Sequence, residues 1–131
     1  MIITVLKIDS LRKTVEAVEM SNDLSGIYAA IEQDFVERVP APFQSPSKDS
    51  LMVDGESLIR RYPAGHVLRG FLWQGFPNQI LYGQGIVVGV RPNGNWTSCS
   101  TSAEELRRMI MFPDQPTLDH NFQLLTGSNP I

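Results

Sequence analysis

The sequence predicts a single α+β domain in which a mixed or antiparallel sheet of five to seven strands carries two helices on one face. Short runs of β-branched and aromatic residues recur along the chain, and two segments place apolar residues at helical spacing. Nine prolines and ten glycines separate these segments. Hydrophobic residues make up 42% of the 131 residues and charged residues 19%, which suits a compact, turn-rich domain better than a helical bundle.

The longest apolar run, residues 79–90, is expected to be the central strand. Residues 86–88 are Ile-Val-Val, so both faces of the strand should be covered there. Three glycines interrupt the run, at Gly83, Gly85 and Gly89. A nucleotide-binding glycine loop would need a helix to open directly after the glycines, but more strand-forming residues follow. The glycines therefore indicate a bulged strand.

Further strands are expected on both sides of this run. The first two predicted strands, residues 2–8 and 14–20, should form a hairpin. The strand that follows the central run, residues 96–100, should return antiparallel to it, because Asn93-Gly94 readily takes the positive φ of a tight turn. The remaining predicted strands are residues 34–39, 51–53 and 66–73.

Two helices are expected. The first, residues 24–33, follows a polar cluster and has apolar residues three and four positions apart, although Gly26 weakens it by about 1 kcal/mol relative to alanine. The second helix should begin after Ser102, because Ser102 and Glu105 have the spacing of a capping box. Pro113 should end it. The apolar face of the second helix comprises Leu106, Met109 and Ile110.

The domain is expected to span residues 1–113 and to be followed by an irregular tail, residues 114–131, which has no clear periodicity and contains two prolines and a glycine. Residues 40–49 should form a long loop, because three prolines remove backbone donors and restrict φ. Phe43 is the only large apolar residue of this loop. It either folds back onto the core or contacts a partner.

The sequence offers few residues for catalysis or metal binding. His66 and His120 are the only histidines, and neither has the spacing of a metal ligand with another His or Cys. Cys99 is the only cysteine and precedes the second helix, where a helix N-terminus can lower the pKa of a thiol. A small core residue in a strand is the favoured interpretation of Cys99. We therefore assign no catalytic residue, no metal ligand and no cofactor.

Charge and hydropathy exclude several classes of protein. Eleven lysines and arginines give no basic patch for nucleic acid, and the net charge is −3. No apolar run approaches the roughly 20 residues of a membrane span. The N-terminus lacks the features of a secretory signal. A soluble, cytoplasmic protein is expected.

An aromatic segment, residues 71–76, is a candidate surface for a protein partner. Phe76 is expected to project from a loop over residues 74–78, beside Trp73 in the preceding strand. Exposed aromatic residues beside a rigid strand are common anchors of protein interfaces. With Phe43, these residues would form the contact surface. The alternative is that the whole segment belongs to the core.

A second candidate site is polar. Asp54 and Glu56 flank a turn glycine, and His66 follows a short distance along the chain. These residues would form the polar edge of a small-ligand site beside the glycine-lined strand. Acidic residues around a turn glycine also commonly cap the turn, so the sequence leaves both roles open.

Several motifs together resemble a family of small domains of unknown function encoded by phages, plasmids and other mobile elements. They are Tyr28-x-x-Ile31 before a strand with Glu37, Leu51-Met52-Val53-Asp54-Gly55-Glu56, and Ile80-x-x-Gly83-x-Gly85-Ile86-Val87-Val88-Gly89, followed by the closing strand and the helix at 102–106. The resemblance covers roughly residues 25–112. The aromatic loop at 71–78 is longer here than in that pattern. The resemblance transfers no catalytic residue.

Two functions are expected from these observations. The first is a non-enzymatic interaction protein of the mobile-element type, which would modulate host or defence machinery through the aromatic and proline-rich surface. The alternative is a nucleotide-like ligand-binding or hydrolytic module that uses the glycine-lined strand. The first function would require a protein partner and the second a small ligand. The sequence leaves open whether the protein forms a homodimer.

Overall fold

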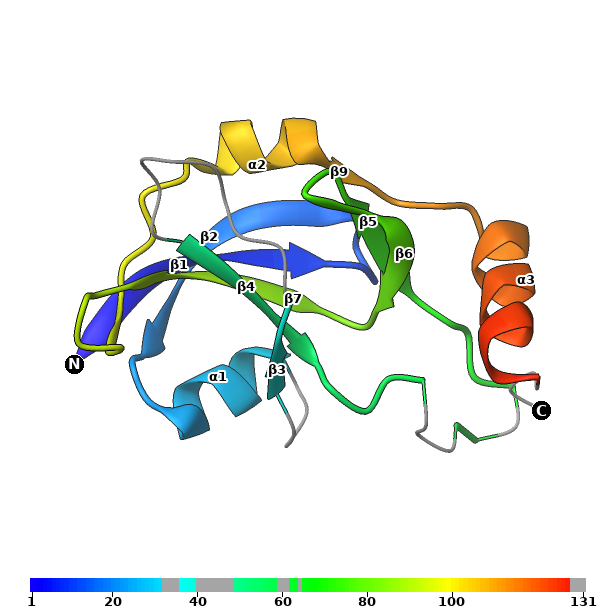
Figure 1. The fold of residues 1–131 in the computed structure, drawn as a ribbon, viewed down its shortest axis with the longest axis horizontal. Helices are drawn as coiled ribbons and strands as arrows, with labels where there is room; N and C mark the ends of the chain where they lie inside the picture. The colour runs from blue at the N-terminus through cyan, green and yellow to red at the C-terminus, as the bar shows by residue number, and fades with distance from the viewer. Residues whose placement is uncertain (32–35, 40–48, 59–61, 64, 128–131) are drawn as a thin grey trace.

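The computed structural model describes residues 1–31, 36–39, 49–58, 62–63 and 65–127. Over these ranges the chain is α+β, with two sheets in which every strand pair is antiparallel. This confirms the predicted fold class, although the prediction had a single sheet. Helices α1 and α2 lie on opposite sides of the larger sheet, and α3 lies beyond the smaller sheet (Figure 1).

The larger sheet has the strand order β2-β1-β7-β4-β3, and β8 also pairs with β7. The predicted hairpin is confirmed, with a regular register that runs from Ile2 opposite Ser21 to Asp9 opposite Thr14. The strand β7 is central, because it pairs with β1 on one side and β4 on the other. The strands are β1 (Ile2–Asp9), β2 (Thr14–Ser21), β3 (Val36–Arg38), β4 (Asp49–Asp54), β7 (Gly85–Val90) and β8 (Trp96–Thr97).

The predicted central strand is two strands that belong to different sheets. The first part of the run is β6 (Phe76–Tyr82), which pairs with β5 (Gly70–Trp73) in the smaller sheet, of order β6-β5-β9. The chain leaves this sheet at Gly83, whose φ is +91°, a left-handed conformation that glycine adopts without strain. It then enters the larger sheet as β7. The bulged-strand prediction was therefore wrong, because Gly83 marks a corner between two sheets.

The aromatic segment also differs from the prediction. Only Gly70–Trp73 of the predicted strand at 66–73 is a strand, and Gln74-Gly75 is a two-residue turn. Phe76 therefore begins β6, where it pairs with Trp73, and does not project from a loop. The chain closes the hairpin with the fewest turn residues, which leaves little room for an exposed loop.

Helices α1 (Leu24–Ile31) and α2 (Ala103–Met109) cover opposite faces of the larger sheet. Ile27 of α1 packs in a cluster with Val5 of β1. Leu106 of α2 packs in another cluster, with the next residue of β1, Leu6. Successive side chains of a strand point to opposite faces, so both faces of this sheet are apolar and each needs a cover. The prediction that both helices lie on one face was therefore wrong.

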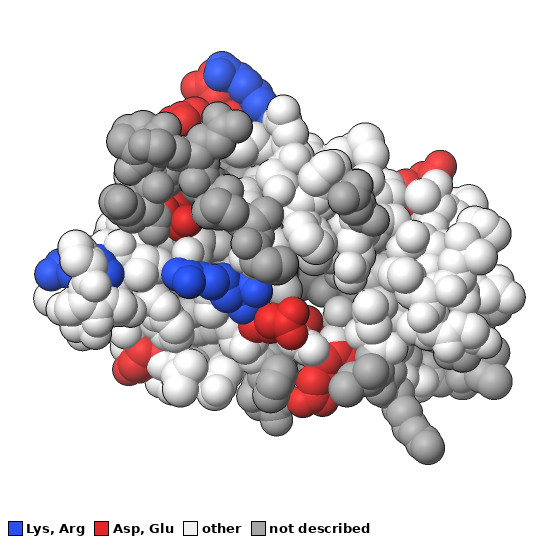
Figure 2. Space-filling view, in the orientation of Figure 1, with Lys and Arg blue, Asp and Glu red and all other residues white. Residues whose placement is uncertain are grey.

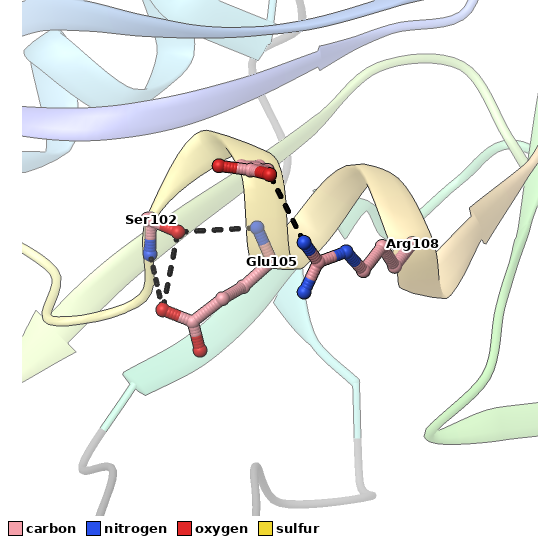
Figure 3. Close-up of polar contacts among 4 residues, drawn as sticks. Ser102, Glu105 and Arg108 are labelled. Atoms are coloured by element: carbon pink, nitrogen blue, oxygen red, sulfur yellow. Dashed lines mark hydrogen bonds and ion pairs between the residues drawn. The ribbon is translucent and has the colours of Figure 1, made fainter.

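The capping box at the start of α2 is confirmed (Figure 3). The Ser102 hydroxyl accepts a hydrogen bond from the Glu105 N–H at 3.1 Å, and the Glu105 carboxylate accepts one from the Ser102 N–H at 3.4 Å. Arg108 forms an exposed ion pair with Glu104, four residues earlier, at 2.9 Å. The helix ends at Met109, and β9 (Ile110–Met111) joins β5.

The predicted irregular tail contains a third helix, α3 (Gln115–Thr126). Asp114 caps it by accepting a hydrogen bond from the Thr117 N–H at 3.0 Å, and Pro116 lies in the first turn, where its missing N–H costs nothing. Gly127 ends the helix in a left-handed conformation. The residues that indicated a tail are thus the start and stop of a helix. Leu118 and Phe122 pack with Leu68, Ile80 and Tyr82.

Four predictions fall partly or wholly outside the described residues. They are the end of the first helix, the start of the strand at 34–39, the proline-rich loop that contains Phe43, and the end of the tail at 128–131. In the ranges that are described, the structure has no helix that is both long enough and apolar enough to cross a membrane.

Candidate ligand-binding site

The structure separates the predicted aromatic contacts. Trp73 is 1% exposed and belongs to the core cluster that contains Leu106, so its side chain is not available to a partner. Of the two alternatives left open for the aromatic segment, a contact surface or the core, the structure places Trp73 in the core. Phe76 is half-buried against the same cluster. Phe43 lies outside the described residues.

A cavity of about 310 Å³ lies where the two sheets meet. We call it the junction cavity. Its wall is formed by the turn after β1, the end of β4, the corner at Gly83 and the irregular segment before β5. Two exposed apolar side chains, Leu11 and Val67, are among its lining residues. Its polar lining residues include Ser10, Asp54, His66, Arg69 and Gln84.

A hydrogen-bond network forms one wall of the junction cavity. The Gln84 side-chain oxygen accepts a hydrogen bond from the Ser10 N–H at 2.6 Å, and the Ser10 hydroxyl oxygen lies 2.9 Å from it. The Gln84 amide donates to Asp9 at 3.0 Å. Burial raises the pKa of Asp9, but hydrogen bonds from the Arg12 N–H and Gln84 outweigh this effect and hold the pKa below its usual value. The network ties β1 to the corner between the sheets.

Arg69 lies between the corner and α3. Its carbonyl oxygen accepts a hydrogen bond from the Gly83 N–H at 2.9 Å, and its guanidinium Nη1 donates to the Gln115 side-chain oxygen at 3.5 Å. Its Nε is buried and has no hydrogen-bond partner among the described residues. The Gln115 contact is the one side-chain hydrogen bond of Arg69 among the described residues, and Nε is its one buried donor without a partner there.

Two of the three predicted polar residues line the junction cavity. Asp54 is 5% exposed and accepts a hydrogen bond from the Glu56 N–H at 3.0 Å, so it caps the turn after β4. His66 is exposed, and its ring stacks on Tyr62 with 4.5 Å between ring centroids. Glu56 does not line the cavity. The structure thus brings Asp54 and His66 to one site but leaves Glu56 outside it.

Asp54 also borders a second cavity, of about 300 Å³, together with Glu37 of β3 and Tyr82 of β6. Acidic side chains gather over the ends of β3 and β4 on the face shown in Figure 2. Burial, followed by the negative charge of Asp119, raises the pKa of Tyr82 to about 12. The Tyr82 hydroxyl therefore stays protonated and donates to the Leu118 carbonyl oxygen at 2.7 Å.

Cys99 has no feature of a reactive thiol. Burial, followed by the negative charge of Asp49, raises the pKa of Cys99 to about 11, so the thiol is protonated at neutral pH. The buried Asp49 carboxylate accepts hydrogen bonds from the Ser100 and Thr101 N–H groups at 3.0 and 2.8 Å, which holds the segment before α2. Among the described residues, no group of three His, Cys, Asp or Glu side chains is placed to hold a metal ion.

A family model described as a domain of unknown function, DUF3846, matches residues 3–111. The chain belongs to this family. The DUF3846 match includes the β1–β2 hairpin, which the resemblance seen in the sequence left out, and it ends at β9. Helix α3 therefore lies outside the DUF3846 match, although its Gln115 contacts Arg69. No curated protein and no solved structure matches the chain significantly.

Sequence reasoning missed three polar residues of the junction cavity: Ser10, Arg69 and Gln84. Arg69 falls within the predicted strand at 66–73, and Ser10 falls between the two strands of the predicted hairpin. The three glycines around Gln84 were the available signal, because a glycine with positive φ often marks a corner. Nothing in the local sequence shows that Ser10 and Gln84, 74 positions apart, share a hydrogen bond.

Proposed function

We propose that this protein is a non-enzymatic binding protein that takes a small ligand in the junction cavity. The observation that carries the proposal is the convergence of Arg69, Asp54 and His66 on one cavity of about 310 Å³, beside the apolar side chains of Leu11 and Val67. Small-molecule sites typically combine an apolar lining with a few convergent polar groups, and this volume is at the lower end of their range.

Binding is favoured over hydrolysis by the contacts of the cavity residues. The Ser10 hydroxyl donates to the Gly83 carbonyl oxygen at 2.6 Å, and a carbonyl oxygen is not a base that activates a nucleophile. Asp54 caps a turn, and His66 stacks on Tyr62. In the described part of the cavity, no serine or cysteine donates a hydrogen bond to a histidine or carboxylate.

A fragment screen on the ¹⁵N-labelled full chain tests this proposal. We expect fragments to shift the backbone amide signals of Gly83 and Val67, which line the cavity. The variant Val67→Trp should block the cavity, because Val67 is 47% exposed and a larger side chain can be added there without disturbing the core. Leu124→Trp, at an exposed position on α3 that does not line the cavity, is the matched control. The proposal fails if no fragment shifts these amides, or if Val67→Trp binds as the wild type does.

A second candidate is a cytoplasmic interaction protein of the mobile-element type, which would bind a protein partner in host or defence machinery. Leu124 and Leu125 favour it, because they are 70% and 49% exposed on α3. The face of α3 visible in Figure 2 carries few charged side chains. Exposed apolar patches mark interaction sites. Phe43 and the half-buried Phe76 belong to this candidate as further predicted contacts.

Affinity capture from the host tests the second candidate. The wild type and Leu124→Asp should retain the same fold, because Leu124 is exposed. A protein captured by the wild type and lost with Leu124→Asp supports an interface on α3. Equal capture by both proteins, or capture of nothing specific, contradicts it.

A further inference from the structure

We propose that the ligand of the junction cavity carries an anionic group, a carboxylate or a phosphate, and that this group pairs with the guanidinium of Arg69, which Gln115 of α3 positions. The inference rests on the proposed function of the cavity. It adds the chemical class of the ligand and gives α3 a role in the site.

The first argument is that the guanidinium of Arg69 has one long contact and one buried donor without a partner among the described residues. Its Nη1 contact to the neutral amide of Gln115 is long, at 3.5 Å, and its buried Nε has no partner among the described residues. No carboxylate of the described residues forms an ion pair with the Arg69 guanidinium. Buried donors in folded proteins are nearly always satisfied, so an orphaned one calls for an explanation. Carboxylates and phosphates match the planar fork of a guanidinium, and they bind it with two parallel hydrogen bonds.

The second argument is that hydrogen bonds hold Arg69 at both its side chain and its backbone. The Gln115 side-chain amide donates to the Leu68 carbonyl oxygen at 3.1 Å and to Asp119 at 2.9 Å, which turns its oxygen toward Arg69. On the other side, the Gly83 N–H donates to the Arg69 carbonyl oxygen at 2.9 Å. Gln115 does not line the cavity, so it is a positioning residue. A site held in this way loses little freedom when a ligand binds.

The third argument concerns Asp54, which lines the same cavity and is buried. A carboxylate beside a bound anion repels it, and the repulsion is stronger where water is scarce. Asp54 therefore selects against ligands that carry many negative charges. The same repulsion predicts that loss of the Asp54 charge strengthens the binding of an anion, an effect that nonspecific binding elsewhere on the surface would not show.

The experiment is an NMR titration of the ¹⁵N-labelled full chain with sodium acetate and, separately, inorganic phosphate, at constant ionic strength. We expect saturable shifts of the Gly83 amide and the Arg69 Nε–H signal. The probe with the lower dissociation constant identifies the anion as carboxylate or phosphate. Methylammonium chloride and urea serve as cationic and neutral probes of similar size.

Four variants make the titration specific. Arg69→Gln should weaken anion binding about tenfold or more, because it removes a charge-assisted hydrogen bond. Gln115→Ala should weaken it less, with an unchanged spectrum elsewhere in the molecule. Asp54→Asn should strengthen it. Arg91→Gln, which removes an exposed arginine of the hairpin turn, should leave it unchanged. If Arg69→Gln does not fold, Arg69→Lys keeps the charge but loses the fork, and it should also bind more weakly.

The outcomes separate this inference from the proposed function. Anion affinity that Arg69→Gln and Asp54→Asn leave unchanged would overturn the inference, as would weaker binding in Asp54→Asn. If neutral or cationic fragments bind in the cavity while acetate and phosphate do not, the inference fails and the proposed function stands. If no probe or fragment shifts the cavity amides, the proposed function fails as well.

Discussion

Gly26 illustrates how a residue that weakens a helix in isolation is required by its neighbours. In the sequence it is only an unfavourable helix residue. In the structure, a Cβ at this position would lie 2.0 Å from the Ser21 carbonyl oxygen, which belongs to the backbone and cannot move aside as a side chain can. The close approach of the end of β2 to α1 therefore determines the residue.

We predict that Gly26→Ala lowers the free energy of unfolding, although helix propensity alone would favour alanine by about 1 kcal/mol. The steric conflict with Ser21 should outweigh that gain. Chemical denaturation measures the difference. Ala29→Gly, at an exposed position of the same helix, is the control and should cost about 0.5–1 kcal/mol. An increase in stability on Gly26→Ala would contradict this prediction, because it would show that the backbone at Ser21 can move away from α1 without loss of free energy.

The two aromatic residues of the β5–β6 hairpin should differ in their contributions to stability. Trp73 is 1% exposed, so Trp73→Ala should cost about 3–5 kcal/mol through the cavity that it leaves. Phe76 is half-buried, so Phe76→Ala should cost clearly less. Urea denaturation of both variants measures this order. Equal losses would mean that Phe76 is as much a core residue as Trp73.

At the scale of elements, α3 is attached to the smaller sheet through Tyr82. The Tyr82 hydroxyl donates to the Leu118 carbonyl oxygen at 2.7 Å and lies 3.0 Å from the Asn121 side-chain oxygen. Phe122 meets the Tyr82 ring edge to face, with 5.4 Å between centroids. A helix that the local sequence only weakly indicates is thus held by contacts to residues about 40 positions earlier.

Alkaline pH should weaken the attachment of α3. The pKa of Tyr82 is raised from 10.0 to about 12, first by burial and then by the charge of Asp119. The folded state therefore keeps this proton between pH 10 and 12, where the unfolded state releases it, so the contribution of Tyr82 to stability is full below pH 10 and is lost as the pH rises toward 12. We expect denaturation midpoints to fall over this range.

Tyr82→Phe separates this effect from other titrations. It should lower stability at neutral pH by about 1 kcal/mol through the lost hydrogen bonds, and it should show a shallower fall with pH above 10. Cys99, whose pKa is also raised, contributes equally to both proteins. Parallel curves for wild type and variant would contradict the role of Tyr82.

At the scale of the whole molecule, the corner at residues 83–84 joins the two sheets (Figure 1). It also forms one wall of the junction cavity. Gln84 is 8% exposed, and its side-chain oxygen accepts a hydrogen bond from the Ser10 N–H, while the Ser10 hydroxyl donates to the Gly83 carbonyl oxygen. Because Ser10 follows β1 and residues 83–84 precede β7, these bonds set the position of the corner against the larger sheet.

Gln84→Ala should cost about 1–3 kcal/mol, because it leaves the buried Ser10 N–H without its acceptor. It should also shift the amide signals of the cavity residues Gly83 and Arg69 without any ligand. Gln74→Ala, in the exposed turn between β5 and β6, is the matched control and should change stability by less than about 0.5 kcal/mol. A stable Gln84→Ala with an unchanged spectrum would show that the corner does not depend on this network.

The sequence by itself determined the features that depend on close neighbours. The β1–β2 hairpin follows from two neighbouring runs rich in strand-forming residues, the start of α2 from Ser102 and Glu105, and the β7–β8 turn from Asn93-Gly94, where the Gly94 N–H donates to the Arg91 carbonyl oxygen at 2.8 Å. Each of these interactions is either local or part of a regular register. The polar residues Asp54 and His66 were also singled out together, with Glu56, as the edge of one small-ligand site, although Glu56 does not line the cavity.

The tertiary structure alone decided how these elements combine. The division of the longest apolar run depends on Gly83 and on the hydrogen bond between Gln84 and Ser10, which are 74 positions apart. Helix α3 is held in position by the hydrogen bond from Tyr82, and the guanidinium of Arg69 is positioned by Gln115, 46 positions later. A side chain's hydrogen-bond partner and its burial are properties of the packed molecule. Local propensity and periodicity, which act over a few residues, therefore cannot determine the cavity that these contacts form.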